Sequence, residues 1–274
     1  MGPAAAIDSL ADMLRLIDAR TGSRAEVRLA RRGVLRVCAH APQATGGADI
    51  TALRVLLVAD LLARTGELRG LQVLTALDLT GTPLAQAAAV DDDADALGIH
   101  PPAARASCHD APSSLGGPVD VHLVGRGAHV DPGQDGLLVG VGAAQLDRAG
   151  RGADAGGALL AGHRDNPRAL RLALMSFPIG QPAVLTGDAL VRAAERLAYW
   201  RERVAQWAES PSRPVPALLA ETVQMAFGDL DTVLALAVLY GLPADASVPA
   251  GAKFETFVYA DRILGLDLAR DVGR

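Results

Sequence analysis

Two cysteines and a few histidines are the strongest candidates for metal ligands in this 274-residue chain. Cys38 follows an apolar run, and His109, His122 and His129 lie in the neighbourhood of Cys108. A reducing compartment favours free thiols or metal ligands over a disulfide between the two cysteines. A buried cysteine is also often only a core residue, and a histidine often only a hydrogen-bonded one. The metal-binding and the structural interpretation both stay open at this point.

Cys38 stands where a strand is expected to meet a loop and a helix. The apolar residues of 34–37 predict a buried strand that ends at Cys38. Apolar residues at helical spacing predict a helix over residues 50–64, with Thr45 or Asp49 as its N-cap. Ligands bind at the carboxyl end of such a strand in an open α/β sheet, beside the helix N-terminus. We therefore expect a βα unit with a ligand-binding cleft.

The residue composition and net charge of the chain indicate which kinds of binding partner are expected. Half of the residues are apolar, 21% are charged and the formal net charge is −5, which is typical of a soluble globular protein. Nucleic-acid binding depends on clustered Lys and Arg, so a tRNA is not the expected ligand. The sequence has no apolar run of the ~18–20 residues that a membrane span needs and no signal-peptide pattern at its start. A cytoplasmic protein without membrane contact is expected.

Further strands and helices are predicted from periodicity and from Gly and Pro breaks. Strands are expected over residues 71–77, 119–124 and 137–141, and helices over residues 7–17, 169–176, 189–209, 215–227 and 232–240. Asp91 to Asp95 are expected to form a solvated helix start, because acidic residues favour the first turn of a helix. A magnesium site at Asp91–Asp93 is the less favoured alternative, since no EF-hand pattern surrounds it.

Several segments resemble, in the same order, the class I cysteinyl-tRNA synthetase family and its relative, the mycothiol-pathway cysteine ligase. They are LRVCAHAP at 35–42, ALRVLLVADLLARTG at 52–66, DADALGIHPP at 93–102 and LGGPVDVH at 115–122. The resemblance implies a short hairpin before the first sheet strand, a Rossmann-like parallel sheet and a C-terminal α-helical bundle. It also implies a zinc ion held by the thiolates that match Cys38 and Cys108.

The catalytic motifs of that family are absent from this chain. The HIGH window falls on Asp49-Ile50-Thr51-Ala52, and the KMSKS window on residues 147–151 has no lysine. The window of the P-H-H-E-N-E motif, which carries a His and a Glu zinc ligand, reads Val130-Asp131-Pro132-Gly133-Gln134-Asp135. Because Asp49 would repel phosphate at the helix N-terminus, no ATP site is expected.

The resemblance and the missing motifs together predict a synthetase-like protein that does not aminoacylate. The expected parts are a Rossmann-like domain with an N-terminal helix at 1–146, a linker at 147–165 and a helical bundle domain at 166–274. Zinc, if bound, is assigned to Cys38, Cys108, His122 and His129, and a cleft that binds cysteine, another thiol or a protein partner to His40, Asp49 and His122. The alternative is a divergent ATP-dependent ligase that activates cysteine or another amino acid.

Overall fold

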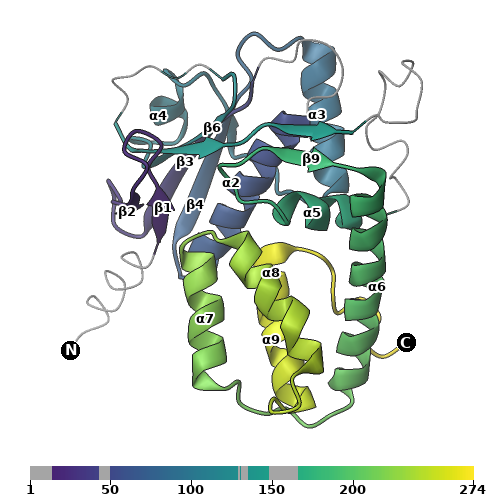
Figure 1. Cartoon of the computed structure of the whole chain (residues 1–274). Helices are drawn as coiled ribbons and strands as arrows, with labels where there is room; N and C mark the ends of the chain where they lie inside the picture. Colours follow the sequence, from purple (N-terminus) through teal and green to yellow (C-terminus); the bar gives the residue numbers. More distant parts are fainter. Residues whose placement is uncertain (1–13, 43–49, 129, 131–134, 148–165) are drawn as a thin grey trace, which may run out of the picture.

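The fold is built on a five-stranded parallel β-sheet with the strand order β5-β4-β3-β6-β7. Figure 1 shows its strands β3, β4 and β6 above the C-terminal helices α7, α8 and α9. A computed structural model describes residues 14–42, 50–128, 130, 135–147 and 166–274. The strands of the sheet are β3 (Val34–His40), β4 (Gln72–Asp78), β5 (Ala104–Arg105), β6 (Val121–Gly125) and β7 (Leu137–Val141). Strand β3 is central and parallel to both neighbours. The predicted Rossmann-like α/β sheet is therefore confirmed.

Strand β3 is buried along its whole length, and its two faces meet different surroundings. Leu35, Val37 and Ala39 belong to the main hydrophobic core, which they share with helix α2 (Ile50–Leu68). Cys38 points to the other face and packs in a small cluster that includes Ala111 from the short helix α4 (Ala111–Ser114). Side chains alternate between the faces of a strand, so Arg36, Cys38 and His40 share the face away from α2.

Helix α2 is apolar around most of its circumference, which is typical of a helix covered on several sides. It contacts strands β3, β4 and β6 on one side and helix α9 (Ala250–Leu264) on another. The predicted helix over 50–64 is thus confirmed and extends one turn further. Its proposed caps, Thr45 and Asp49, lie outside the described residues.

The predicted N-terminal helix is wrong at its described end. Arg15–Ile17 form strand β1, which pairs antiparallel with β2 (Arg24–Glu26) in the hairpin that the resemblance implies. Leu14 and Leu16 are buried, whereas Arg15 and Ile17 are exposed, and this period of two is that of a strand. Residues 7–13 of the predicted helix lie outside the described residues.

The expected position of the acidic run Asp91–Asp95 in its helix is also wrong. Helix α3 (Leu84–Ala96) begins after Pro83, so the aspartates occupy its second half and not its first turn. Proline fixes a backbone angle suited to a helix start and cannot donate a hydrogen bond, which favours the earlier beginning. Asp91 pairs with Arg105 of strand β5, a contact that ties the helix to the edge of the sheet.

The C-terminal part of the described chain is mostly helical. It contains α5 (Pro167–Met175), α6 (Gly187–Ala208), α7 (Ala217–Gly228), α8 (Thr232–Gly241), the short 3-10 helix η1 (Leu242–Ala244) and α9. The predicted helices are found within a few residues of their bounds. Strand β8 (Ala144–Leu146) pairs in parallel with β9 (Ala183–Leu185), a contact that the sequence did not predict.

One continuous hydrophobic core runs from the sheet into these helices. The division of the chain into two domains and a linker, and the separate helical bundle, therefore stay predictions. No helix in the described part of the chain combines the length and the apolar character that crossing a membrane requires.

Candidate metal centre

Cys38, His40 and His122 form a buried group whose potential ligand atoms all lie within 4.8 Å of one another. Cys38 on β3 is the register partner of His122 on β6, and His40 follows two residues after Cys38. Register partners in a parallel sheet and residues two apart on one strand face the same side. The topology alone therefore brings the three side chains together, at the carboxyl end of β3 and the amino-terminal end of β6.

The two imidazoles are linked by a hydrogen bond whose direction is fixed by a backbone carbonyl. Nε2 of His122 lies 3.0 Å from the carbonyl oxygen of Asp135, which can only accept. Nε2 of His122 therefore donates, and its Nδ1, in the neutral ring, accepts from Nε2 of His40 at 2.9 Å. Because Nε2 of the neutral His40 ring carries the proton, its Nδ1 has none, and this atom faces away from His122.

Nδ1 of His40 faces the carboxylate of Asp78, the register partner of His40 on β4. Nδ1 is buried and makes no hydrogen bond of ordinary geometry to a described residue, although Oδ2 of Asp78 lies 3.4 Å away. Asp78 is held by Thr80, which donates from its backbone N–H at 2.9 Å and from its hydroxyl at 2.6 Å. The backbone N–H of Cys108 donates to Oδ2 at 2.9 Å.

The surroundings of Asp78 and His122 determine which of the two side chains is charged at neutral pH. Burial alone would raise the pKa of Asp78, but the neighbouring imidazole of His40 and the hydrogen bonds from Thr80 outweigh it and hold that pKa well below its usual range. Burial lowers the pKa of His122 to about 4, and the neighbouring His40 adds to the effect. Asp78 is thus a carboxylate and His122 a neutral imidazole at neutral pH.

The thiol of Cys38 is protonated in this environment. Burial, together with the nearby Asp78 and Cys108, raises its pKa to about 12. A thiol with so high a pKa is a poor nucleophile, because the thiolate is the reactive form. A metal ion reverses this preference, since a coordinating thiol loses its proton.

The donor set fits a metal ion. One thiol and two imidazoles are ligands of the kind found in protein metal sites, and both rings have a second polar contact, Asp78 for His40 and the Asp135 carbonyl for His122. The buried Cys38, His40 and His122 group could therefore hold a metal ion.

The chain matches no protein-family model and no curated protein.

The predicted site residues are partly brought together. Cys38 and His122 lie in the group, as does His40, which was expected in the cleft but not as a metal ligand. Cys108 is half-buried, forms no disulfide with a described residue and is close enough to influence the Cys38 thiol, yet it lies outside the group of three. Its role as a ligand stays a prediction. His129 and Asp49 lie outside the described residues.

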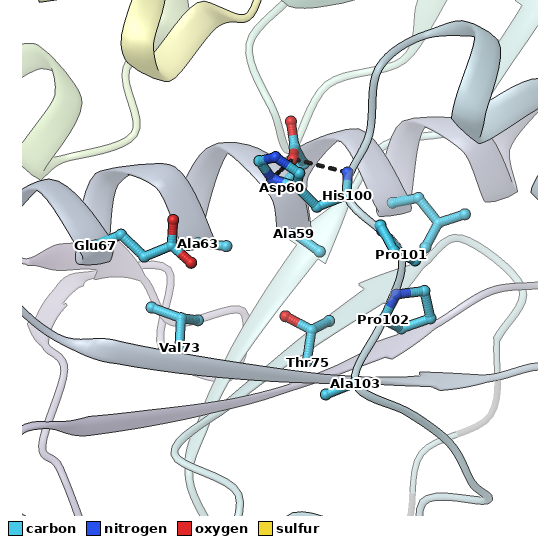
Figure 2. A pocket seen from close by; sticks show the side chains of 11 residues that line it. Ala59, Asp60, Ala63, Glu67, Val73, Thr75, His100, Pro101, Pro102 and Ala103 are labelled. Carbon is cyan, nitrogen blue, oxygen red and sulfur yellow. Dashed lines mark hydrogen bonds and ion pairs between the residues drawn. The ribbon is translucent and has the colours of Figure 1, made fainter.

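A cavity of about 200 Å³ lies on the α2 side of the sheet and not at the metal group (Figure 2). Its wall contains Asp60 and Glu67 from α2, Val73 and Thr75 from β4, and His100. Asp60 already pairs with Arg171, and its other oxygen lies 3.0 Å from Nδ1 of His100. The Asp60 carboxylate therefore connects structural elements. The cavity is a weaker candidate for a functional site than the buried Cys38, His40 and His122 group.

Proposed function

We propose that this protein is a non-aminoacylating relative of the cysteinyl-tRNA synthetase and cysteine ligase group that holds zinc and binds a small thiol such as cysteine. The observation that carries the proposal is the buried Cys38, His40 and His122 group, at the carboxyl end of β3 and the start of β6. Thiolates and imidazoles are typical zinc ligands, and a zinc site with three protein ligands leaves one position open. A bound zinc ion would supply a Lewis-acidic site for a thiolate ligand.

The protons of the group are arranged so that the three side chains can become ligands. Nδ1 of His122 has a lone pair directed toward His40, because Nε2 donates to the Asp135 carbonyl. If the proton of His40 moves from Nε2 to Nδ1, it points toward Oδ2 of Asp78, which lies 3.4 Å from Nδ1. The lone pair of Nε2 is then available to bind a metal ion. A carboxylate beside a ligating histidine is the usual second contact that fixes its tautomer. The unsatisfied Nδ1 of His40 in the present arrangement supports this assignment.

The start of helix α2 supports the view that this protein does not activate its ligand with ATP. Thr51, in the HIGH window, is buried, and its hydroxyl donates to the carbonyl of Ala144 at 3.2 Å and accepts from its N–H at 3.1 Å. Strand β8 thus covers a helix N-terminus that a phosphate would have to approach. Among the described residues of this window, Ile50, Thr51 and Ala52, none carries a positive charge.

Metal analysis of the purified protein tests the zinc assignment. We expect about one zinc per chain in the wild type and a loss of more than half of it in Cys38→Ser and in His122→Ala. His100→Asn is the matched control, because His100 is exposed and lies outside the group; it should keep its zinc. Cys108→Ser separates a three-residue site, which keeps zinc, from one that includes the second cysteine.

Calorimetric titration tests the thiol ligand and the absence of ATP chemistry. Zinc-loaded protein should bind cysteine and fail to bind serine, which has the same shape without the sulfur. The proposal would be contradicted if metal-free wild type bound cysteine with the same affinity as the zinc-loaded protein. Equal binding of cysteine and serine by the zinc-loaded protein would also contradict it. Cysteine-dependent pyrophosphate exchange with ATP would identify a ligase instead.

A further inference from the structure

A second hollow, bounded by helices α5, α6 and α8, has the lining of an anion-binding site. Its volume is about 680 Å³, within the range of roughly 300–1,000 Å³ typical of small-molecule pockets. It shares no residue with the Cys38, His40 and His122 group. An occupant of this hollow would therefore be independent of the zinc and thiol chemistry proposed above.

One face of helix α6 makes most of the wall. Ala189, Arg192, Arg196 and Tyr199 recur at spacings of three and four residues, so they line up along the helix. The small side chain of Ala189 leaves space at the start of the helix. Tyr240, near the end of α8, closes the far side. The hollow thus has two guanidinium groups and two phenol rings around an open volume.

The guanidinium of Arg196 is held in place by aromatic rings. Its central carbon lies 4.7 Å from the ring centre of Tyr240 and 5.5 Å from that of Tyr199. Arg203 lies over the Tyr199 ring as well, at 5.4 Å. Stacking uses the flat face of a guanidinium and leaves its N–H edge available for acceptors. Because Arg196 is already ordered, it loses little conformational freedom when it binds an anion.

The charges of the hollow are not balanced within the described structure. Neither Arg192 nor Arg196 forms an ion pair with a carboxylate among the described residues, and Glu195 is the one acidic residue in the lining. This positive excess stands out on a chain with a formal net charge of −5. An arginine pair with free N–H groups is suited to the oxygens of a phosphate.

We infer that this hollow binds a phosphorylated small molecule of about mononucleotide size. Its phosphate accepts hydrogen bonds from Arg192 and Arg196, and the rest of the ligand lies against Tyr199. A nucleic-acid chain is a poorer match, because it needs a track of many basic residues, whereas two arginines here share one hollow.

Calorimetric titration with AMP, adenosine and inorganic pyrophosphate at low salt tests the inference. AMP should bind, and adenosine, which lacks the phosphate, at least tenfold more weakly. Arg192→Gln and Arg196→Gln should each weaken AMP binding by about 10- to 100-fold, the usual effect of losing a hydrogen bond to a charged group. Arg213→Gln makes the same charge change at an exposed position outside the hollow and should bind AMP like the wild type.

Ala189→Glu tests the site without removing any stacking contact. A glutamate in the first turn of α6 is favourable for the helix, so the variant should fold, and its carboxylate should weaken AMP binding at least tenfold. Failure of both AMP and pyrophosphate to bind would overturn the inference. So would AMP affinities unchanged in Arg192→Gln and Ala189→Glu, or a single-stranded RNA that binds more tightly than AMP and loses affinity in the same variants.

Discussion

Nη2 of Arg171 donates a hydrogen bond of 2.5 Å to Oδ2 of Asp60, and both side chains are completely buried. The pair joins α5 to α2, the helix that covers the sheet. Nε of Arg64 donates to the same oxygen at 2.8 Å. Burial alone would raise the pKa of Asp60, but the charges of Arg171 and Arg64 outweigh it and lower that pKa. Asp60 is therefore an ionised residue on which several elements converge.

Asp60→Asn should destabilise the protein strongly, because it leaves Arg171 buried without its counter-charge. Breaking a buried ion pair from one side costs about 3–5 kcal/mol. Asp271→Asn is the matched control, since Asp271 pairs with Arg270 and Arg274 at the surface and should cost about 1 kcal/mol or less. Urea unfolding of the two variants gives the comparison. Equal free energies of unfolding would show that the Asp60 pair contributes no more than a surface pair.

The lowered pKa of Asp60 should make the folded protein less stable at acidic pH. Its pKa is lower in the folded than in the unfolded chain, so its contribution is fully present above the unfolded value of about 3.9 and is lost as the pH falls below it. Urea unfolding at several pH values between 6 and 3 measures this loss. In Asp60→Asn the free energy of unfolding should fall less steeply below pH 4 than in the wild type. A slope equal to that of the wild type would rule out Asp60 as its source.

The candidate site was only partly predictable from the sequence. Cys38 and His122 were identified by a motif resemblance. Cys38 lies near the carboxyl end of β3, the expected ligand edge of the sheet, whereas His122 lies near the start of β6. The alternation of a strand already places His40 on the same face as Cys38, and this signal could have added His40 to the ligands. The register that sets Cys38 opposite His122 and His40 opposite Asp78 depends on strand order, which no local pattern contains.

The elements were predictable where one periodicity dominated. Strand β3 and helix α2 have long apolar patterns, and both begin at the predicted residue; β3 continues to His40, two residues beyond its predicted end at Cys38. Around Leu14 and Leu16 the apolar residues fit a helical stripe over residues 7–17, yet the described end follows a period of two. Strands β8 and β9 have three residues each, and their pairing is decided by packing across the chain and not by propensity.

Gly142 should be intolerant of any side chain. A Cβ at this position would clash with the backbone carbonyl of Gln181, in the segment that precedes β9. Gly142→Ala should therefore cost about 1–3 kcal/mol, as overpacking does where backbone must move. Gly187→Ala is the control, because the first residue of α6 has open space around it and alanine favours a helix. Thermal unfolding should show a lower Tm for Gly142→Ala and an unchanged or higher Tm for Gly187→Ala.

The two cysteines should differ sharply in their reactivity toward a thiol reagent. Cys38 is completely buried and its pKa is raised to about 12, whereas Cys108 is half-buried. Because the thiolate is the reacting form, native protein at pH 8 should show one fast thiol per chain with a disulfide reagent such as DTNB. Cys108→Ser should abolish the fast reaction and Cys38→Ser should preserve it, while unfolding in denaturant with a chelator should expose both thiols of the wild type. A fast thiol in native Cys108→Ser would mean that Cys38 is accessible and ionised, which the closed Cys38, His40 and His122 group does not allow.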